Sequence, residues 1–337
     1  MIFNLHALSI EKQIINSIKN ITNQYKEIKF TTNISDNLLL MEIGISISFK
    51  KGNPKEVILS ISNEREEIDG RFIICLNYWL PLCIEATRKS HSSLNLTFNI
   101  CDSGGLNALS MDSHDPNQII PNEYSMRNYY KNRYTKNPYN LKKFQRKWLK
   151  RKAILFWRGS TTGGFILNTT NDLYKLKRVK LCQLYNNNNT LNLKISKIVQ
   201  NKLPKQIFID ELKKQNLWAR PVIENKFSSY CFYPDIPGNA LAWGSIRKYL
   251  MGNLIFKPYT QRKLYYYRFM KPWKHFIPVE EDFSDIHEKY KWAISHIEDA
   301  SFIAWNGYIK ANNYIRTLPE IFIKIVIEKN KNNLKNL

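Results

Sequence analysis

The sequence contains no run of 18 uncharged apolar residues, so it has no segment with the length and character of a membrane-spanning helix. Residues 1–10 lack the basic stretch followed by an apolar stretch that marks a secretory signal peptide. These two absences lead us to expect a cytoplasmic protein.

Cysteine is sparse, and its spacing argues against two kinds of cross-link. The 5 cysteines include no Cys-x-x-Cys pair and their total is odd, which fits neither a disulfide framework nor a zinc site. Most of them lie among apolar residues, so we expect them to be thiols of the core. They are Cys75, Cys83, Cys101, Cys182 and Cys231.

Acidic residues are few: the chain has 28 of them and 51 lysines and arginines, so the formal net charge is +23. Such a charge attracts phosphorylated sugars, anionic lipid head groups and nucleic acid alike, so it does not select a partner. Lysine and asparagine are used heavily throughout, as in residues 186–189, so part of the charge reflects composition. A basic nucleic-acid-binding protein is the alternative from a different class, but no recognised RNA- or DNA-binding motif accompanies the charge.

Two common catalytic patterns are also missing, because the chain has neither a Walker loop nor a Gly-x-Ser-x-Gly elbow. The segment Asp112-Ser113-His114-Asp115 is where a metal site or a serine–histidine pair would be sought. Adjacent side chains rarely point to the same place, and the metal-binding Asp-x-Asp pattern is not matched there. Neither alternative is favoured.

The elements expected in the first half are those of an α/β protein. A length of 337 residues, 43% of them hydrophobic, predicts two domains. Residues 103–152 form a weakly patterned connection, and we place the domain boundary at its end. Before it, apolar periodicity predicts helices at 10–23 and 76–88 and strands at 38–49, 57–61 and 94–100.

The second half continues the alternation of strands and helices. Strands are expected at 153–157, 230–233 and 254–257, a helix or strand at 178–185, and helices at 205–217 and 240–251.

The stretch around which the chain is organised is residues 152–164, where a short apolar run ends at an arginine, hydroxyls and glycines. Such a break is typical of the point where a parallel strand ends and its crossover connection begins, and ligands of open α/β sheets bind there. The guanidinium of Arg158 suits a phosphate, and glycine lets backbone N–H groups approach closely. We expect an anion-binding loop, with an ordinary surface turn as the alternative. Its other members are Gly159, Ser160, Thr161, Thr162, Gly163 and Gly164.

A second phosphate-compatible place is the turn Pro237-Gly238-Asn239. We expect this turn to open the helix at 240–251, so that Gly238 and Asn239 present free N–H groups and the positive end of a helix dipole to an anion. Simple capping of a helix that packs into the sheet is the alternative, and both descriptions can hold together.

Asp102 follows the strand expected at 94–100 and precedes two glycines. A carboxylate at a strand end is well placed for chemistry. The alternative is a turn in which the side chain of Asp102 only accepts hydrogen bonds from the next amides.

Several blocks, in the right order, resemble glycosyltransferase family 90, which holds bacterial lipopolysaccharide-modifying proteins and animal protein O-glucosyltransferases. The resemblance covers about residues 95–315 and leaves roughly the first ninety uncovered. The blocks are residues 157–164, 178–182, 238–243, 271–279 and 283–286.

The resemblance implies a GT-B architecture, in which two Rossmann-like domains face a central cleft. Residues 1–150 would form the acceptor-side domain and residues 151–337 the nucleotide-sugar domain, with terminal helices packing back on the first. It implies inverting transfer from a UDP-sugar of glucose or xylose type, without a metal or another cofactor.

The expected acceptor is a cell-surface glycan, a lipid-linked glycan or a lipopolysaccharide precursor, with a protein acceptor as the alternative. Peripheral contact with an anionic membrane is expected, and a nucleic-acid partner is not.

The resemblance also assigns roles to single residues. Residues 98–102 align with the strand that delivers the general base, so Asp102 becomes the favoured base, with Asp112 and Asp115 next. Animal members carry an arginine where this chain has Gly244, and Arg178 or Arg247 would take over its charge. The donor-binding residues that follow from the resemblance are Arg158, Gly159, Ser160, Thr161, Thr162, Gly163, Arg178, Gly238, Asn239, Ala242, Trp243 and Arg247. Trp273 and His275 either shape the donor pocket or belong to the core.

Overall fold

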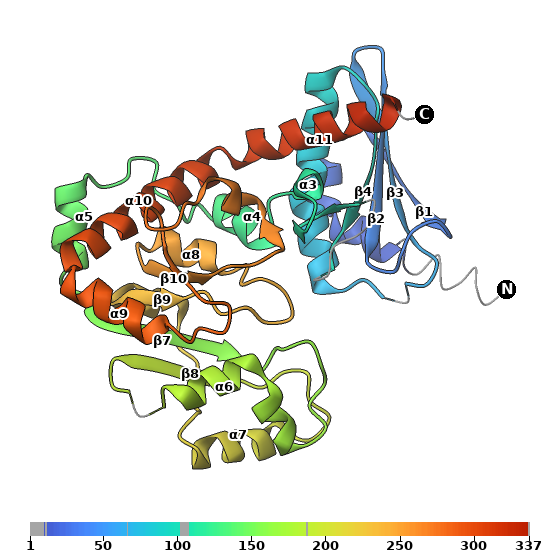
Figure 1. Cartoon of the computed structure of the whole chain (residues 1–337). Coiled ribbons are helices and arrows are strands. Elements are labelled where there is room, and N and C mark those ends of the chain that lie inside the picture. The colour runs from blue at the N-terminus through green and yellow to red at the C-terminus, as the bar shows by residue number, and fades with distance from the viewer. Residues whose placement is uncertain (1–9, 11, 66, 102–107, 187, 336–337) are drawn as a thin grey trace. The chain divides into compact units, whose positions relative to one another are not determined.

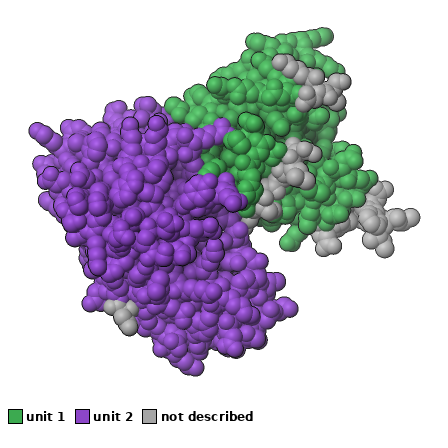
Figure 2. Space-filling view, in the orientation of Figure 1, with its two compact units in different colours: residues 1–127, 262–265, 317–337 green, residues 128–261, 266–316 purple. Residues whose placement is uncertain are grey.

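The computed structural model describes residues 10, 12–65, 67–101, 108–186 and 188–335. The chain divides into two compact units, shown in Figures 1 and 2. Unit 1 comprises Met1–Arg127, Arg262–Tyr265 and Thr317–Leu337, and unit 2 comprises Asn128–Gln261 and Tyr266–Arg316. No helix within the described ranges is long and apolar enough to cross a membrane.

Unit 1 is built on a mixed five-stranded sheet with the order β1-β3-β2-β4-β5. The strand β2 runs antiparallel to both of its neighbours, whereas β1 pairs with β3, and β4 with β5, in parallel. This sheet therefore differs from the all-parallel sheet that a Rossmann-like first domain would have. The strands are β1 (Lys29–Ser35), β2 (Glu42–Lys50), β3 (Asn53–Ser62), β4 (Leu94–Asn99) and β5 (Leu109–Ser110).

The antiparallel strand has a local cause. Lys51 and Gly52, with φ of 50° and 80°, form a two-residue turn, and positive φ at both positions suits a tight hairpin between β2 and β3. From β3 the chain returns through α3 (Gly70–Ser90) to β4, which runs parallel to β3 with β2 between them. The strand, helix and strand predicted at 57–61, 76–88 and 94–100 are thus confirmed, and β2 lies between the two strands.

One face of this sheet is covered by α3 and by α11 (Leu318–Lys335), the last helix of the chain (Figure 1). The ring of Phe98 on β4 stacks between Trp79 of α3 and Phe322 of α11, with centroid distances of 5.2 and 6.2 Å. Segments far apart in the sequence therefore contribute to one core. Unit 1 also holds α2 (Lys19–Gln24), η1 (Pro116–Gln118) and the short pair β6 (Asp112–Ser113) with β11 (Lys263–Leu264), and α4 (Glu123–Tyr130) leads from it into unit 2.

Unit 2 is an α/β unit whose five strands are all parallel, in the order β12-β10-β9-β7-β8. The chain runs from β7 outward to β8 and then returns to β9 on the other side of β7. Strand order therefore reverses between β7 and β9, and in open α/β sheets the ligand crevice lies at the carboxyl ends of such strands. The strands are β7 (Lys152–Ser160), β8 (Leu191–Lys197), β9 (Tyr230–Pro234), β10 (Leu254–Pro258) and β12 (Ile277–Val279).

The core of unit 2 is largely aromatic. The ring of Phe232 on β9 meets Trp148, Phe256 and Tyr290 edge-on, with centroids 5.7, 5.8 and 5.6 Å away. The helices are α5 (Leu141–Trp148), α6 (Lys177–Leu184), α7 (Lys205–Lys214), α8 (Ser245–Leu250), α9 (Ile286–Ser295) and α10 (Ile297–Arg316), with the 3₁₀ turns η2 (Thr170–Lys175), η3 (Glu224–Ser229) and η4 (Tyr265–Phe269).

Most of the expected elements are present, and two differ. The region 103–152, expected to be a connection, contains α4 and α5 within its described part. The helix expected from residue 240 begins only at Ser245, so the helix start placed at Gly238 and Asn239 is wrong. Four of the cysteines are buried as expected, and Cys101 is half-buried.

Candidate functional site

The loops after β7 and β9 meet at the carboxyl edge of the parallel sheet of unit 2, where strand order reverses. The first loop continues from Ser160 at the end of β7, and the second begins at Asp235 after β9. The sequence pointed to both loops from their composition alone. The structure adds the side chain that joins them.

Arg178, in the first turn of α6, joins the two loops through its guanidinium. Its Nε donates to the carbonyl of Pro237 at 2.9 Å and its Nη2 to that of Ile236 at 3.1 Å. Its Nη1 donates to the carbonyl of Ser160 at 3.1 Å and to the hydroxyl of Thr162 at 2.5 Å. The backbone after β9 is therefore bonded to the end of β7 through one charged group.

This arrangement gives the physical reason for the late start of α8. The carbonyls of Ile236 and Pro237 accept from Arg178, and the amide of Gly238 donates to the carbonyl of Ala240 at 2.9 Å. Backbone groups committed to a guanidinium and a tight turn do not enter a helical ladder. The segment after β9 thus bends at residues 238–240 instead of forming a helix there, and it carries Ala242 and the buried Trp243 to the start of α8.

Glycine is required where the loops approach each other. A Cβ on Gly238 would lie 2.4 Å from the hydroxyl of Thr162 and 2.9 Å from Nη2 of Arg178. On β7, a Cβ on Gly159 would lie 2.0 Å from the ring of Trp157, which folds over that position. Both glycines therefore allow close packing around Arg178.

Gly163 and Gly164 turn their amides toward the second loop. Their N–H groups donate to the same oxygen, Oδ1 of Asn239, at 3.0 and 2.9 Å. Gly164 has φ of 87°, a conformation that favours glycine. Asn239 thus acts here through its side chain, and not by capping a helix.

Arg158 lies on β7 two residues before Ser160, and the register with β8 shifts between Gly159 and Ser160. Its Nη1 donates to the carbonyls of Trp157 and Asn192, at 2.7 and 2.9 Å, and its guanidinium lies over the ring of Phe156. Arg158 therefore also holds β7 to β8.

The two arginines share an electrostatic feature. Burial lowers the pKa of both guanidiniums, that of Arg178 to about 10. Neither forms an ion pair with any carboxylate of the described residues; their acceptors are carbonyls and hydroxyls. Because a partly buried charge without a counter-ion is costly, the site is predisposed to take an anion.

Thr161 has a structural part in the same loop. Its hydroxyl donates to the carbonyl of Val199 and accepts from the amide of Val199, both at 2.9 Å. This pair of bonds fixes the end of β7 to the segment after β8. The hydroxyls of Ser160 and Thr162 lie 3.4 Å apart beside Arg178.

Sequence reasoning missed a buried polar group next to this site. Asp235, directly after β9, accepts from the hydroxyls of Ser245 and Tyr267. Burial raises its pKa, and the neighbouring charge of Lys257 acts in the opposite direction. A sequence signal for Asp235 was present, because a carboxylate that directly follows a buried strand is the same pattern that indicated Asp102. Asp235 anchors the start of α8 to the end of β9.

Arg247 is not brought to this site. Its Nη1 donates to the carbonyl of Arg133 at 3.1 Å, and its Nε lies 3.7 Å from a carboxylate oxygen of Glu224. Glu224 begins η3, which leads into β9, so this network lies toward the amino ends of the strands.

Trp273 and His275 precede β12, so they too belong to the amino edge of the sheet. Trp273 is 44% exposed and packs edge-on against Trp292 of α9. His275 is buried, and its Nδ1 accepts from the amide of Lys271 at 2.8 Å. Burial and neighbouring lysines lower the pKa of His275 to about 4. Both residues pack the turn that leads into β12.

An apolar cavity of about 170 Å³ adjoins the second loop. Residues of α6, the loop after β9 and the segment after β12 form its walls, and charged side chains stand at its rim. The cavity offers room for a flat or apolar group beside the loops that Arg178 joins. Its lining residues are Lys177, Lys180, Leu181, Leu184, Ile236, Pro237, Glu281, Asp282 and Phe283.

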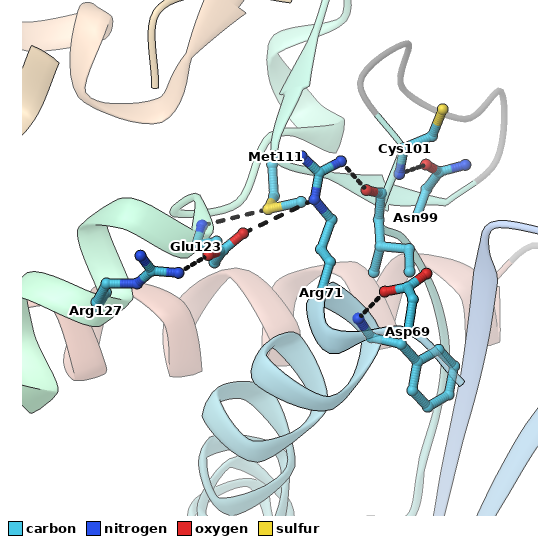
Figure 3. A network of polar contacts seen from close by, with 9 residues as sticks. Asp69, Arg71, Asn99, Cys101, Met111, Glu123 and Arg127 are labelled. Atoms are coloured by element: carbon cyan, nitrogen blue, oxygen red, sulfur yellow. Dashed lines mark hydrogen bonds and ion pairs between the residues drawn. The ribbon is translucent and has the colours of Figure 1, made fainter. Parts of the chain in front are cut away.

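In unit 1, the expected base Asp102 lies outside the described residues. The preceding strand end is held by a polar network, shown in Figure 3. Arg71 of α3 donates to the carbonyl of Ile100 at 3.3 Å, and the carboxylate of Glu123 interacts with both Arg71 and Arg127. Glu123 is buried, so this network fixes the end of β4 to α3 and α4.

The other acidic candidates have structural partners. Asp112, on β6, is fully buried and forms an ion pair with Arg262, which directly precedes β11. Asp115 is exposed and accepts from the amide of Asn117 at the start of η1. His114 is exposed. Within the described ranges, no three His, Cys, Asp or Glu side chains are grouped to hold a metal ion.

The fold and the site of unit 2 define a doubly wound α/β protein with an anion-compatible crevice. The sequence profile described as glycosyl transferase family 90 matches residues 131–317. The chain therefore belongs to this family, as the sequence blocks predicted. The matched region contains the whole sheet of unit 2.

Curated relatives match over a shorter stretch. Protein O-glucosyltransferase 3 of Homo sapiens is 29% identical over 90 residues, which are 27% of this chain and 18% of the relative. Protein O-glucosyltransferase 2 of Danio rerio is 29% identical over 89 residues, 26% of this chain and 18% of the relative. The match thus spans less than a fifth of these relatives. A crystal structure of Anabaena HepE in complex with UDP-glucose shows a TM-score of 0.35 and 11% identity over 61% of this chain and 55% of that one.

The first prediction concerns Arg178. In Arg178→Lys, one ammonium cannot reach both loops, and carbonyls that accept from Nε and Nη2 lose their donors. We expect the free energy of unfolding of unit 2 to fall by roughly 2–4 kcal/mol, measured by urea denaturation. Arg220→Lys, at an exposed position, is the matched control. Equal stability of the two variants would contradict the role given to Arg178.

Proposed function

We propose that this chain is a glycosyltransferase whose donor is a nucleoside-diphosphate sugar, namely a UDP-sugar. One observation carries the proposal. The buried guanidinium of Arg178, which has no carboxylate partner among the described residues, stands at the carboxyl edge of the sheet, beside the hydroxyls of Ser160 and Thr162 and the amide of Gly163. A diphosphate supplies the negative charge that this site does not contain.

The proposed chemistry follows from the leaving group. When the sugar is transferred, negative charge grows on the departing diphosphate, and fixed donors stabilise that charge. Arg178 and Arg158 supply positive charge, while Ser160 and Thr162 supply hydroxyls. Because these groups are already held by the backbone, they need little rearrangement during the reaction. We propose that transfer proceeds without a metal, as the family resemblance implies.

The acceptor side of the proposal rests on sequence. Inversion requires a carboxylate that removes a proton from the acceptor hydroxyl while its oxygen attacks the anomeric carbon. Asp102 is the proposed base, and the polar network at the end of β4 supports the strand that precedes it. We also propose a GT-B architecture, with unit 1 as the acceptor side and unit 2 as the donor side.

The sugar and acceptor are proposed as classes. The donor sugar is of glucose or xylose type, and the acceptor is a hydroxyl of a cell-surface glycan or lipopolysaccharide precursor. A protein acceptor is the second candidate, since curated relatives are described as protein O-glucosyltransferases. With a net charge of +23, we propose peripheral attraction to an anionic membrane that carries the acceptor.

The donor proposal predicts that UDP raises the melting temperature, because a ligand that binds only the native state stabilises it. UDP at about 100 times its dissociation constant adds about 2.7 kcal/mol to the free energy of unfolding. EDTA should leave this stabilisation, and the release of UDP from the UDP-sugar, unchanged. A strict requirement for manganese would contradict the metal-free mechanism.

The base proposal predicts that Asp102→Asn retains folding and UDP affinity but loses transfer, because an amide cannot accept the proton. We expect the rate to fall ~10²–10⁴-fold, followed as UDP release with UDP-glucose or UDP-xylose and a panel of hydroxyl acceptors. Asp210→Asn, at an exposed carboxylate of α7, is the control. A rate within about threefold of the unmodified protein would place the base elsewhere.

A further inference from the structure

The amides of Gly163 and Gly164 form a small concave donor site. Both N–H groups converge on one oxygen, Oδ1 of Asn239, at 3.0 and 2.9 Å. Successive amides that point to one place beside a residue of positive φ, as Gly164 has, are a common anion-binding arrangement. The oxygen that fills this site is the uncharged oxygen of a carboxamide.

The surroundings favour a charged oxygen over a neutral one. Thr162, directly before Gly163, binds Nη1 of Arg178, so the donor site is adjacent in the chain to a buried positive charge. Arg178 and Arg158 form no ion pair with a described carboxylate. An oxygen with a full negative charge would gain more here than a carboxamide does, because hydrogen bonds to ionised acceptors are roughly twice as strong.

The loop is built to keep the two amides in place. A Cβ on Gly163 would lie 2.3 Å from Cδ2 of Leu176, so the backbone packs tightly against that side chain. The hydroxyl of Thr161 is hydrogen-bonded to the backbone of Val199, and these bonds fix the part of the loop that precedes Gly163. Asn239 is different, because its side chain is exposed. The amides of Gly163 and Gly164 are therefore fixed in place, whereas the side chain of Asn239, which accepts from them, can move away.

We infer that the amides of Gly163 and Gly164 are a subsite for an anionic oxygen of the donor diphosphate. In the free protein the side chain of Asn239 occupies this subsite, and it must leave before the diphosphate can bind. This inference rests on the proposed function and deepens it. Asn239 acts as a latch: its two hydrogen bonds hold the loop after β9 against the loop after β7. Binding of the diphosphate breaks them, so the latch lowers donor affinity and couples donor binding to release of the second loop.

The test compares two substitutions that have opposite effects under this inference. Asn239→Ala empties the subsite, whereas Asn239→Asp fills it with a carboxylate that binds the amides and repels phosphate. Calorimetric titration with pyrophosphate, UDP and uridine would measure the effects. We expect Asn239→Ala to bind pyrophosphate and UDP roughly three- to tenfold more tightly than the unmodified protein, and Asn239→Asp to bind both more weakly. Uridine, which lacks the diphosphate, should bind all three proteins equally.

Two controls separate the latch from a general effect on the fold. Asn225→Ala removes an exposed side chain of η3, near the opposite edge of the sheet, and should leave pyrophosphate affinity unchanged. Amide hydrogen exchange at Gly163 and Gly164 in the free protein should be faster in Asn239→Ala, because the acceptor is gone. If Asn239→Ala is too unstable to purify, Asn239→Ser replaces it, since the shorter side chain does not reach both amides.

The outcomes distinguish the latch from the proposed function. If the unmodified protein binds UDP and Asn239→Ala binds pyrophosphate equally or more weakly, the latch is refuted and the donor proposal stands. If the unmodified protein does not bind UDP, the donor proposal fails. In that case, tighter pyrophosphate binding by Asn239→Ala would still support the anion subsite, and unchanged binding would overturn it.

Discussion

The hydrogen bonds of one guanidinium hold this site together. Arg178 reaches from α6 to the end of β7 and to the loop after β9, and it binds backbone carbonyls of both. Those carbonyls would otherwise be available to a helix, so the same bonds delay the start of α8 and keep the second loop non-helical. Glycine at 238 follows from this constraint, because the guanidinium and the hydroxyl of Thr162 occupy the space of a side chain.

The same interaction creates the electrostatic character of the site. Carbonyls and hydroxyls accept hydrogen bonds from Arg178 and Arg158 but do not neutralise their charge. Asp235 lies nearby, yet burial raises its pKa and its oxygens accept from Ser245 and Tyr267, so it is engaged locally. The crevice thus combines positive charge with donors that the backbone already positions. An anion that binds there is met by groups that need little reorganisation, which is the condition for stabilising charge as it develops.

Sequence reasoning located the loops but not their connection. Composition revealed Ser160 to Gly164 and Gly238 to Asn239, because glycines and hydroxyls after an apolar run are a local signal. The partners of Arg178 lie 16 to 59 positions away in the chain, and no local pattern reports them. The helix expected at residue 240 failed for this reason, since tertiary bonds to Ile236 and Pro237 override helix propensity. The antiparallel β2 follows from the two-residue turn at Lys51 and Gly52, whereas the order of the strands in the sheet depends on contacts between distant segments.

The central claim is that the donor diphosphate binds where Arg178 joins the loops after β7 and β9. Mapping the backbone amide chemical shifts of the isotope-labelled full-length protein during titration with UDP tests this most directly. The account predicts that the largest changes fall on residues 160–164 and 235–239, including the amides of Gly163 and Gly164. Large changes confined to the turn of Trp273 and His275, with those loops unaffected, would contradict it.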